Sequence, residues 1–437
     1  MSQDYDRLAL SRRRFLATTC GFAAAAGSGL CAHASPEATN AMKAGLAPAP
    51  ADTRNAAEPF WGKHQGGILT PPQGHTYFAA LDLVTTERKD IVKMLQQWTV
   101  AAARMARGQP AEPLAQDAAV PAPDSGETQG LPPARLTLTF GFGAGLFIKD
   151  GQDRYGLASR RPAALVDMPK FTGDQLVDAR TGGDLSVQAC ADNPQVAFHA
   201  VRQLTRLAYD VAQIRWVQTG FSSSFGGTET PRNLMGFKDG TNNPSIQDPA
   251  AMDKFVWVGD EGPDWMRGGS YVVARRIRIA LEHWDRMNVA FQEQTVGRQK
   301  NSGAPLGQEK EFDKADYEAT DKDGNPVIPE NSHIRLAAAV NNDGAQILRR
   351  PYSYNDGANF TAERWPPWRQ EMEFDAGLFF ICYQRDVRTG FIRIFDKMSK
   401  LDMMNQFVTP VGEGFFACPG GIAEGEFIGQ RLFEKAS

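Results

Sequence analysis

The sequence has few cysteines and few long apolar runs, and both absences exclude classes of protein. Five cysteines occur among 437 residues, at positions 20, 31, 190, 382 and 418, and none forms a Cys-x-x-Cys pair. That spacing argues against a zinc ribbon and against covalently attached c-type haem. Cys190 and Cys382 lie in apolar, strand-like runs, so we expect buried thiols there. Beyond the N-terminal segment, no apolar run reaches the roughly 18 residues that cross a membrane.

The chain also lacks a strong excess of charge and is poor in histidine. Its formal net charge is −4 and its isoelectric point is near 6.0, whereas nucleic-acid binding requires a basic face. We therefore expect no nucleic acid partner. After the N-terminal segment only five histidines remain: His64, His75, His199, His283 and His333. His199 and His283 fall in predicted helices, where an ordinary core or surface role is the common one.

The N-terminus has the order of an export signal. Arginines at 12–14 precede Phe-Leu, an Ala/Gly-rich segment follows at 17–32, and Ala-His-Ala at 32–34 offers a cleavage site. The arginine pair matches twin-arginine export, which carries folded proteins and so favours a cofactor enzyme. We predict a signal peptide at 1–34, a flexible leader at 35–58 and a periplasmic protein. A disordered basic tail is the alternative.

The remaining chain predicts an α+β fold with two similar halves. Hydrophobic periodicity predicts strands at 75–84, 135–140, 184–191 and 214–221, with helices at 87–107 and 194–213. Residues 108–133 are rich in Pro, Gly and Ala and predict a long surface loop of unassigned role. The order β-α-β-β-α-β is that of a ferredoxin-like unit.

A second series of elements follows in the C-terminal half. Strands are predicted at 271–280, 333–340, 347–354, 378–384 and 415–418, and helices at 282–296 and 387–408. We predict two ferredoxin-like halves in tandem, an N-terminal domain at 59–230 and a C-terminal domain at 231–437.

Three places in the second half combine residues that suit chemistry. At 236–244, Gly-Phe-Lys-Asp-Gly-Thr-Asn-Asn-Pro is either a tight turn or a loop whose glycines let Asp239 approach a flat ligand. His333 lies where a polar loop meets an apolar segment, and suits a structural role or a ligand role. Arg349 and Arg350 end a predicted strand, so their side chains face opposite ways and only one can face a given pocket.

These segments resemble the dye-decolorising peroxidase family. Residues 236–241 are similar to its Gly-x-x-Asp-Gly signature, and residues 60–71, 268–277 and 296–305 resemble its EfeB-type deferrochelatase/peroxidase group. The resemblance covers nearly all of the chain after residue 58. It implies two ferredoxin-like halves, with one non-covalent haem b per chain held mainly by the C-terminal half. Residues 338–342 depart from the Asn-Pro-Arg sequence usual in relatives.

The resemblance also implies roles for individual residues. His333 is the expected proximal ligand of the haem iron, Asp239 the catalytic proton shuttle and Arg349 the catalytic distal arginine. Asp375 is the expected partner that orients His333, with Glu373 as the second choice. The residues expected to contact haem are Gly240, Thr241, Asn242, His333, Ala338, Ala339, Val340 and Arg349.

The activity implied is reduction of hydrogen peroxide with oxidation of dyes, phenols or porphyrin-type donors. An ordinary Asp pKa is about 3.9, so a carboxylate shuttle predicts an acidic optimum. Release of iron from haem, in iron acquisition, is a related activity implied by the same group. A non-enzymatic periplasmic haem carrier is the alternative, although a carrier needs no Asp and Arg on its open face. Expected partners are a donor or haem, the twin-arginine machinery, other iron-uptake components and further copies of this chain.

Overall fold

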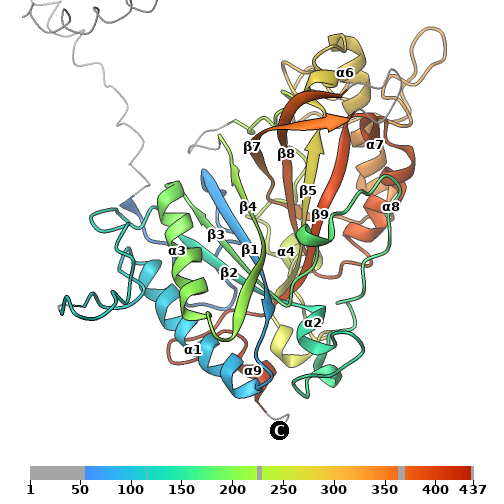
Figure 1. The fold of residues 1–437 in the computed structure, drawn as a ribbon. Coiled ribbons are helices and arrows are strands. Elements are labelled where there is room, and N and C mark those ends of the chain that lie inside the picture. The colour runs from blue at the N-terminus through green and yellow to red at the C-terminus, as the bar shows by residue number, and fades with distance from the viewer. Residues whose placement is uncertain (1–54, 116, 224–228, 363–369, 435–437) are drawn as a thin grey trace, which may run out of the picture. The chain divides into compact units, whose positions relative to one another are not determined.

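The computed structural model describes residues 55–115, 117–223, 229–362 and 370–434, so the predicted signal peptide and nearly all of the predicted leader lie outside it. Within these residues nine strands form a single sheet (Figure 1). They are β1 (His75–Leu83), β2 (Thr137–Gly143), β3 (Leu185–Ala191), β4 (Ala212–Phe221), β5 (Ser270–Ile279), β6 (Leu348–Arg349), β7 (Tyr352–Ala362), β8 (Gln370–Gln384) and β9 (Val408–Cys418).

The sheet closes on itself like a barrel. Its order is β5-β9-β2-β3-β1-β4-β7-β8-β6, and β5 also pairs with β8, so eight strands form a ring to which β6 is added. Every pairing between these strands is antiparallel. The first-half and second-half strands meet through short pairings, β2 with β9 and β4 with β7. The two halves therefore share one closed sheet.

Each half arranges its four long strands in the same order. In the first half the sheet runs β2-β3-β1-β4, and in the second half it runs β7-β8-β5-β9. In both, the first strand in sequence lies between the third and the fourth. The helices of the first half are α1 (Arg88–Met105), α2 (Ala144–Phe147) and α3 (Pro194–Leu207). Those that follow are α4 (Pro249–Phe255), α5 (Leu281–Trp284), α6 (Val289–Val296), α7 (His333–Ala337), α8 (Phe391–Leu401) and α9 (Gln430–Phe433).

Most predicted elements of the first half are confirmed. In the second half the helix predicted at 387–408 is too long, because α8 ends at Leu401 and β9 begins at Val408, and one predicted strand is wrong. Residues 333–340, predicted as a strand, form α7 and a following 3-10 turn, Ala339–Asn341. The alternation of apolar residues there is too short to distinguish a strand from a helix. Packing decides the outcome, because Leu336 of α7 is buried against Ile394 and Met398 of α8. The predicted helix at 282–296 is divided into α5 and α6, with Asn288 capping the second.

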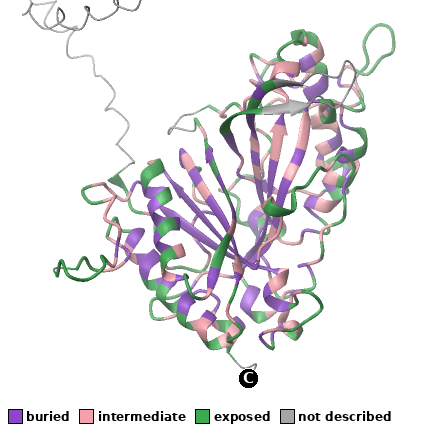
Figure 2. Cartoon of the chain, viewed as in Figure 1, coloured by how far each residue is buried: buried purple, intermediate pink, exposed green. Residues whose placement is uncertain are grey.

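Alternate residues of each strand serve two different cores. Phe78 of β1 packs inside the ring against Phe379 of β8 and Phe416 of β9, so the interior draws on both halves. On the outer faces, α1 and α3 cover the first-half strands, while α8 packs against the second-half strands (Figure 1). Figure 2 shows buried residues following the strands and exposed residues on the outer sides of the helices. Cys190, Cys382 and Cys418 are free and buried, as the sequence predicts for the first two.

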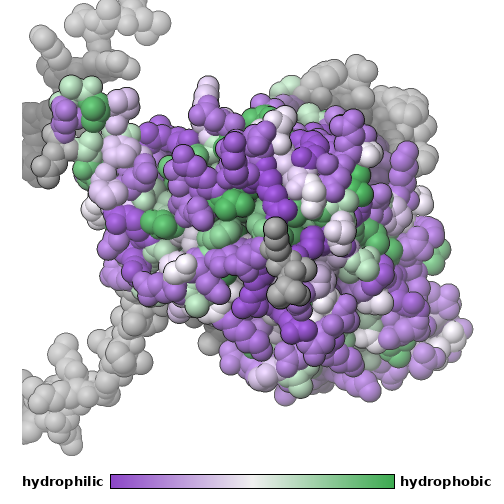
Figure 3. Space-filling model, turned by 90° about the horizontal axis from the view of Figure 1, so that it is seen from below, coloured by the Kyte–Doolittle hydropathy of each residue, from purple (hydrophilic) through white to green (hydrophobic). Residues whose placement is uncertain are grey.

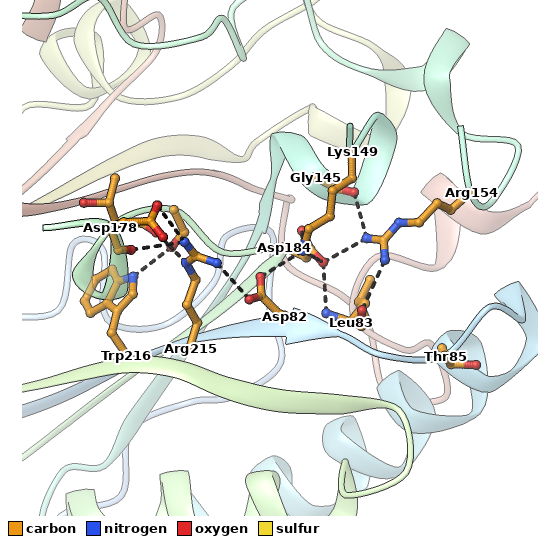
Figure 4. A network of polar contacts seen from close by, with 12 residues as sticks. Asp82, Leu83, Thr85, Gly145, Lys149, Arg154, Asp178, Asp184, Arg215 and Trp216 are labelled. Atoms are coloured by element: carbon orange, nitrogen blue, oxygen red, sulfur yellow. Dashed lines mark hydrogen bonds and ion pairs between the residues drawn. The ribbon is translucent and has the colours of Figure 1, made fainter. Parts of the chain in front are cut away.

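In the first half a network of ion pairs joins β1 and β4 to the segment after α2 and to the residue before β3 (Figure 4). Asp184, whose side chain is 2% exposed, accepts from Lys149 at 3.0 Å and from Arg154 at 2.9 Å. Asp82 binds both Lys149 and Arg215, each at 3.0 Å. Every charge in this group has an opposite partner, so the network holds the elements together and leaves no acid or base free for chemistry.

The face of the molecule drawn in Figure 3 is mainly hydrophilic. Figure 3 shows hydrophobic residues on one face only in small groups among hydrophilic ones. None of the helices in the described ranges has both the length and the apolar character needed to cross a bilayer.

Candidate active site

His333 opens α7 and is held from behind by a buried carboxylate. Its Nδ1 lies 2.7 Å from Oδ2 of Asp402, a residue whose side chain is 3% exposed. Asp402 is itself fixed, because its Oδ1 accepts from the backbone N–H of Met404 at 2.8 Å. The packing of α7 on α8, which ends just before Asp402, brings the two residues together across 69 positions of sequence.

The carboxylate controls the charge of the imidazole. Burial alone would lower the pKa of His333, but the charge and the hydrogen bond of Asp402 oppose it and raise this pKa above its ordinary value. Nε2 of His333 forms no hydrogen bond with any described residue, and the His333 side chain is 33% exposed. The ring therefore presents one free nitrogen, with its tautomer and orientation set by Asp402.

The loop around Asp239 is rigid because its neighbours are bonded on both sides. The backbone N–H of Asp239 donates to the carbonyl of Pro231 at 2.8 Å. Lys238 and Thr241 both bind the carboxylate of Glu311, the latter at 2.9 Å. Gly240 has a φ of +121°, a conformation that side chains rarely adopt, which accounts for glycine directly after Asp239.

Arg349 reaches this loop from β6. The strand pairs with β8 and directs consecutive side chains to opposite faces. Arg349 Nη1 lies 2.8 Å from Asp239 Oδ1, whereas Arg350 is buried and binds Gln73 and the carbonyl of Thr70. The expectation that only one of the two arginines can face the site agrees with this arrangement.

Asn243 fixes the backbone of Arg349. Its Nδ2 donates to the carbonyl of Arg349 at 2.7 Å, and its Oδ1 accepts from the N–H of the same residue at 3.2 Å. The Asp239 and Arg349 side chains are 14% and 26% exposed, so the pair is partly open. Both groups influence the pKa of His333, which Arg349 lowers and Asp239 raises.

The structure corrects the predicted partner of His333. Asp375 binds Arg276 at 2.7 Å and Asn359 at 2.8 Å, and the second choice, Glu373, binds Arg278 at 2.6 Å. Both acids lie on β8 opposite arginines of β5, so their charges are neutralised within the sheet. Asp402 was missed because only the contact between α7 and α8 reveals it. Asn243 lies inside the Asn-Asn-Pro run singled out in the sequence.

The remaining predicted contacts lie on the segments next to these groups. Thr241 is engaged by Glu311, and Asn242 is exposed. On the side of His333, Ala338 is buried, while Val340 is 76% exposed. Contact of these residues with haem stays a prediction.

The donor set fits a haem iron. A histidine with a free nitrogen and a carboxylate behind it is the arrangement that makes an imidazole a strong axial ligand. Asp239 and Arg349 provide an acid–base group and a permanent cation in the same site. A carboxylate can accept and return a proton, and an arginine beside it can stabilise developing negative charge. Fold and site together define a haem-dependent peroxidase.

The chain belongs to the Dyp-type peroxidase family. The model of the N-terminal part of that family matches residues 65–222, and the model of the C-terminal part matches residues 230–423.

Curated relatives and solved structures agree with this assignment. The chain is 37% identical over 432 residues to a deferrochelatase of Escherichia coli, covering 97% of this chain and 96% of the relative. A deferrochelatase of Shigella flexneri is 36% identical over 434 residues, 97% of each chain. A DyP-type peroxidase from Streptomyces coelicolor is 39% identical with a TM-score of 0.79, covering 89% of this chain and all of its own. Ferric DtpA from Streptomyces lividans, at 38% identity, has the same TM-score and the same coverage.

Proposed function

We propose that His333, Asp239 and Arg349 are the working groups of this haem peroxidase, and that Asp402 orients the first of them. The observation that carries the proposal is the arrangement of a carboxylate-backed imidazole and a 2.8 Å carboxylate–arginine pair in one site. Haem, when bound, supplies the redox-active iron at which peroxide is reduced. We propose that each chain binds one non-covalent haem b, mainly through residues of its second half.

His333 would hold the iron through Nε2, because Nδ1 is committed to Asp402. Asp402 accepts the Nδ1 proton and thereby keeps Nε2 unprotonated and available. The partly anionic character that this bond gives to the imidazole would make it a stronger ligand for a haem iron. The further residues that would contact the haem are Gly240, Thr241, Asn242, Ala338, Ala339 and Val340.

Asp239 would move the proton. In its ionised form the carboxylate would accept a proton from hydrogen peroxide, and in its protonated form it would return a proton to the departing oxygen. Arg349 is charged at all relevant pH values and stabilises the negative charge that develops on the departing oxygen. The 2.8 Å contact keeps the carboxylate and the guanidinium beside the same reacting atoms.

Dyes, phenols or porphyrin-type compounds are the proposed electron donors. The relatives named deferrochelatase support a second activity, in which haem is the substrate and iron is released with the porphyrin left intact. The alternative of a haem carrier without catalysis is disfavoured, because a carrier has no use for the Asp239–Arg349 pair. We further propose export by the twin-arginine route to the periplasm, work beside other iron-uptake components, and assembly into a homo-oligomer.

We also propose that the two halves are tandem ferredoxin-like units. The same strand order in both halves supports this, as does the interruption of the family match between residues 222 and 230.

The experiment compares wild type with Asp239→Asn after both have been loaded with haem. Dye oxidation by hydrogen peroxide is measured across acidic pH, and the porphyrin product is analysed separately after incubation with excess haem. Rapid peroxide-dependent oxidation that the substitution abolishes supports the peroxidase. Iron-free porphyrin formed by wild type supports iron release. A haem-loaded wild type that does neither is a carrier, and overturns the proposal.

A further inference from the structure

The loop at 108–133, to which the sequence assigned no role, is docked on helix α3 by polar groups. Arg206 of α3 donates to the carbonyl of Ala122 at 2.7 Å. Gln203, on the same helix, donates to the hydroxyl of Ser125. Asp124 also fixes the conformation of the loop, because its carboxylate accepts hydrogen bonds from the backbone N–H groups of Ala111 and Gly126, each at 2.7 Å.

His199 of α3 lies at the centre of this contact and has no hydrogen bond. Its side chain is 3% exposed, and both ring nitrogens are buried without a hydrogen-bond partner among the described residues. Two carboxylates flank the ring: Asp124 Oδ2 is 3.3 Å from Nε2, and Glu127 Oε2 is 3.2 Å from Nδ1. Asp124 is as deeply buried as the imidazole, at 1% exposure of its side chain.

The spacing suits ligands of one cation better than it suits hydrogen bonds. Charge-assisted N–H···O bonds are about 2.7–2.9 Å long, and neither contact has that length or alignment. Two ligands bound to a tetrahedral zinc ion at about 2.0–2.1 Å lie about 3.3 Å apart. One ligand atom from each of Asp124, Glu127 and His199 can be chosen so that all three lie within 4.8 Å of one another.

We propose that Asp124, Glu127 and His199 bind one divalent transition-metal ion of the zinc class, which fixes the loop at 108–133 to α3. Imidazole together with carboxylates favours such an ion over Mg²⁺ or Ca²⁺, which take oxygen ligands alone. Only one nitrogen of the imidazole can bind the ion, so each of the three residues contributes a single ligand atom and the other ring nitrogen keeps its proton. Solvent completes the coordination on the side of Glu127.

The charges around the cluster permit a divalent ion. Two carboxylates are offset in part by Arg202, which lies 3.2 Å from Oε1 of Glu127 but is 48% exposed. Glu127 also accepts a hydrogen bond from the hydroxyl of Ser125, which holds its carboxylate beside the imidazole. The competing account is an imidazolium held between the two carboxylates, with a proton in place of the metal.

The test uses the haem-loaded protein after treatment with EDTA. Zinc is titrated by calorimetry, and cleavage by endoproteinase Glu-C, which can cut in this loop after Glu127, is followed with and without zinc. We expect uptake of one zinc per chain in the micromolar range or tighter, with slower cleavage in the loop. His199→Gln and Asp124→Asn should abolish both effects, while His283→Gln, outside the cluster, should keep them.

Two results would overturn the metal site. One is wild-type protein that takes up no stoichiometric zinc, and the other is uptake that persists unchanged in His199→Gln. Glu-C cleavage that ignores EDTA and zinc but slows as the pH falls supports the imidazolium account instead. If His199→Gln does not fold, as judged by its Soret band, the wild-type titration and Asp124→Asn decide the question.

Discussion

Replacing Asp402 by Asn removes the charge behind His333 while keeping the size of the side chain. The amide oxygen can still accept either from His333 or from Met404, but the anion that holds the Nδ1 proton is lost. We therefore expect His333 to become a weaker iron ligand. The haem should dissociate faster, and the reduction potential of its iron should rise.

The size of the effect follows from the contact. A hydrogen bond to a charged group contributes about 1.5–3 kcal/mol, and each 1.4 kcal/mol is about tenfold in affinity. Water screens part of this, because the His333 side chain is 33% exposed. We therefore expect the lower part of the range, about a 10- to 30-fold faster loss of haem.

The assay is transfer of haem to excess apomyoglobin, followed by absorbance at neutral pH. Asp396→Asn is the matched control, because Asp396 lies on α8 and binds only the exposed Lys400, at 2.7 Å. The control should lose haem at the wild-type rate. Equal rates in wild type and Asp402→Asn would refute the role of Asp402, whereas an equally large effect in Asp396→Asn would indicate a general disturbance of α8.

Three further predictions concern the same site. In the haem-free protein Asp402 raises the pKa of His333 above its ordinary value. The ion pair between the two side chains should therefore stabilise the fold fully below about pH 6.5, and this stabilisation should be lost as pH rises through the folded-state pKa. Denaturant unfolding at several pH values measures the effect. Asp239→Asn should retain haem but lower turnover with peroxide by about 10²–10⁴-fold, and wild-type turnover at acidic pH in steady-state assays would contradict the shuttle. Asn243→Ala should remove both hydrogen bonds to the backbone of Arg349. The free energy of unfolding measured with denaturant should fall by about 1–3 kcal/mol, and the reaction with peroxide measured by stopped flow should be slower. If neither quantity changes, Arg349 is positioned without Asn243.

Local hydrophobic patterns in the sequence were sufficient to predict most strands and helices of the first half. The strand from His75 and the helix from Arg88 were predicted to within about two residues at each end, because their apolar residues recur over long stretches with one period. The two buried thiols followed from apolar neighbours. Where the apolar run was short, as at residues 333–340, the period was ambiguous and tertiary packing chose the helix.

The site was predictable where a short motif encodes it. Asp239 stands between glycines whose spacing marks the loop, and the alternation of a strand implied that only one of Arg349 and Arg350 could join it. The partner of His333 was not predictable in this way. Asp402 is brought to it by the contact between two helices, whereas Asp375, closer to a recognisable strand, is neutralised by Arg276 across the sheet.

The most direct test of the account is the visible spectrum of haem-loaded wild type and His333→Ala, before and after one equivalent of hydrogen peroxide. The account predicts a Soret band in wild type that peroxide changes and an added dye restores, and a variant that binds haem weakly or with a shifted band. An unchanged Soret band and an unchanged response to peroxide in His333→Ala would contradict the assignment of His333 as the iron ligand, and with it the site described here.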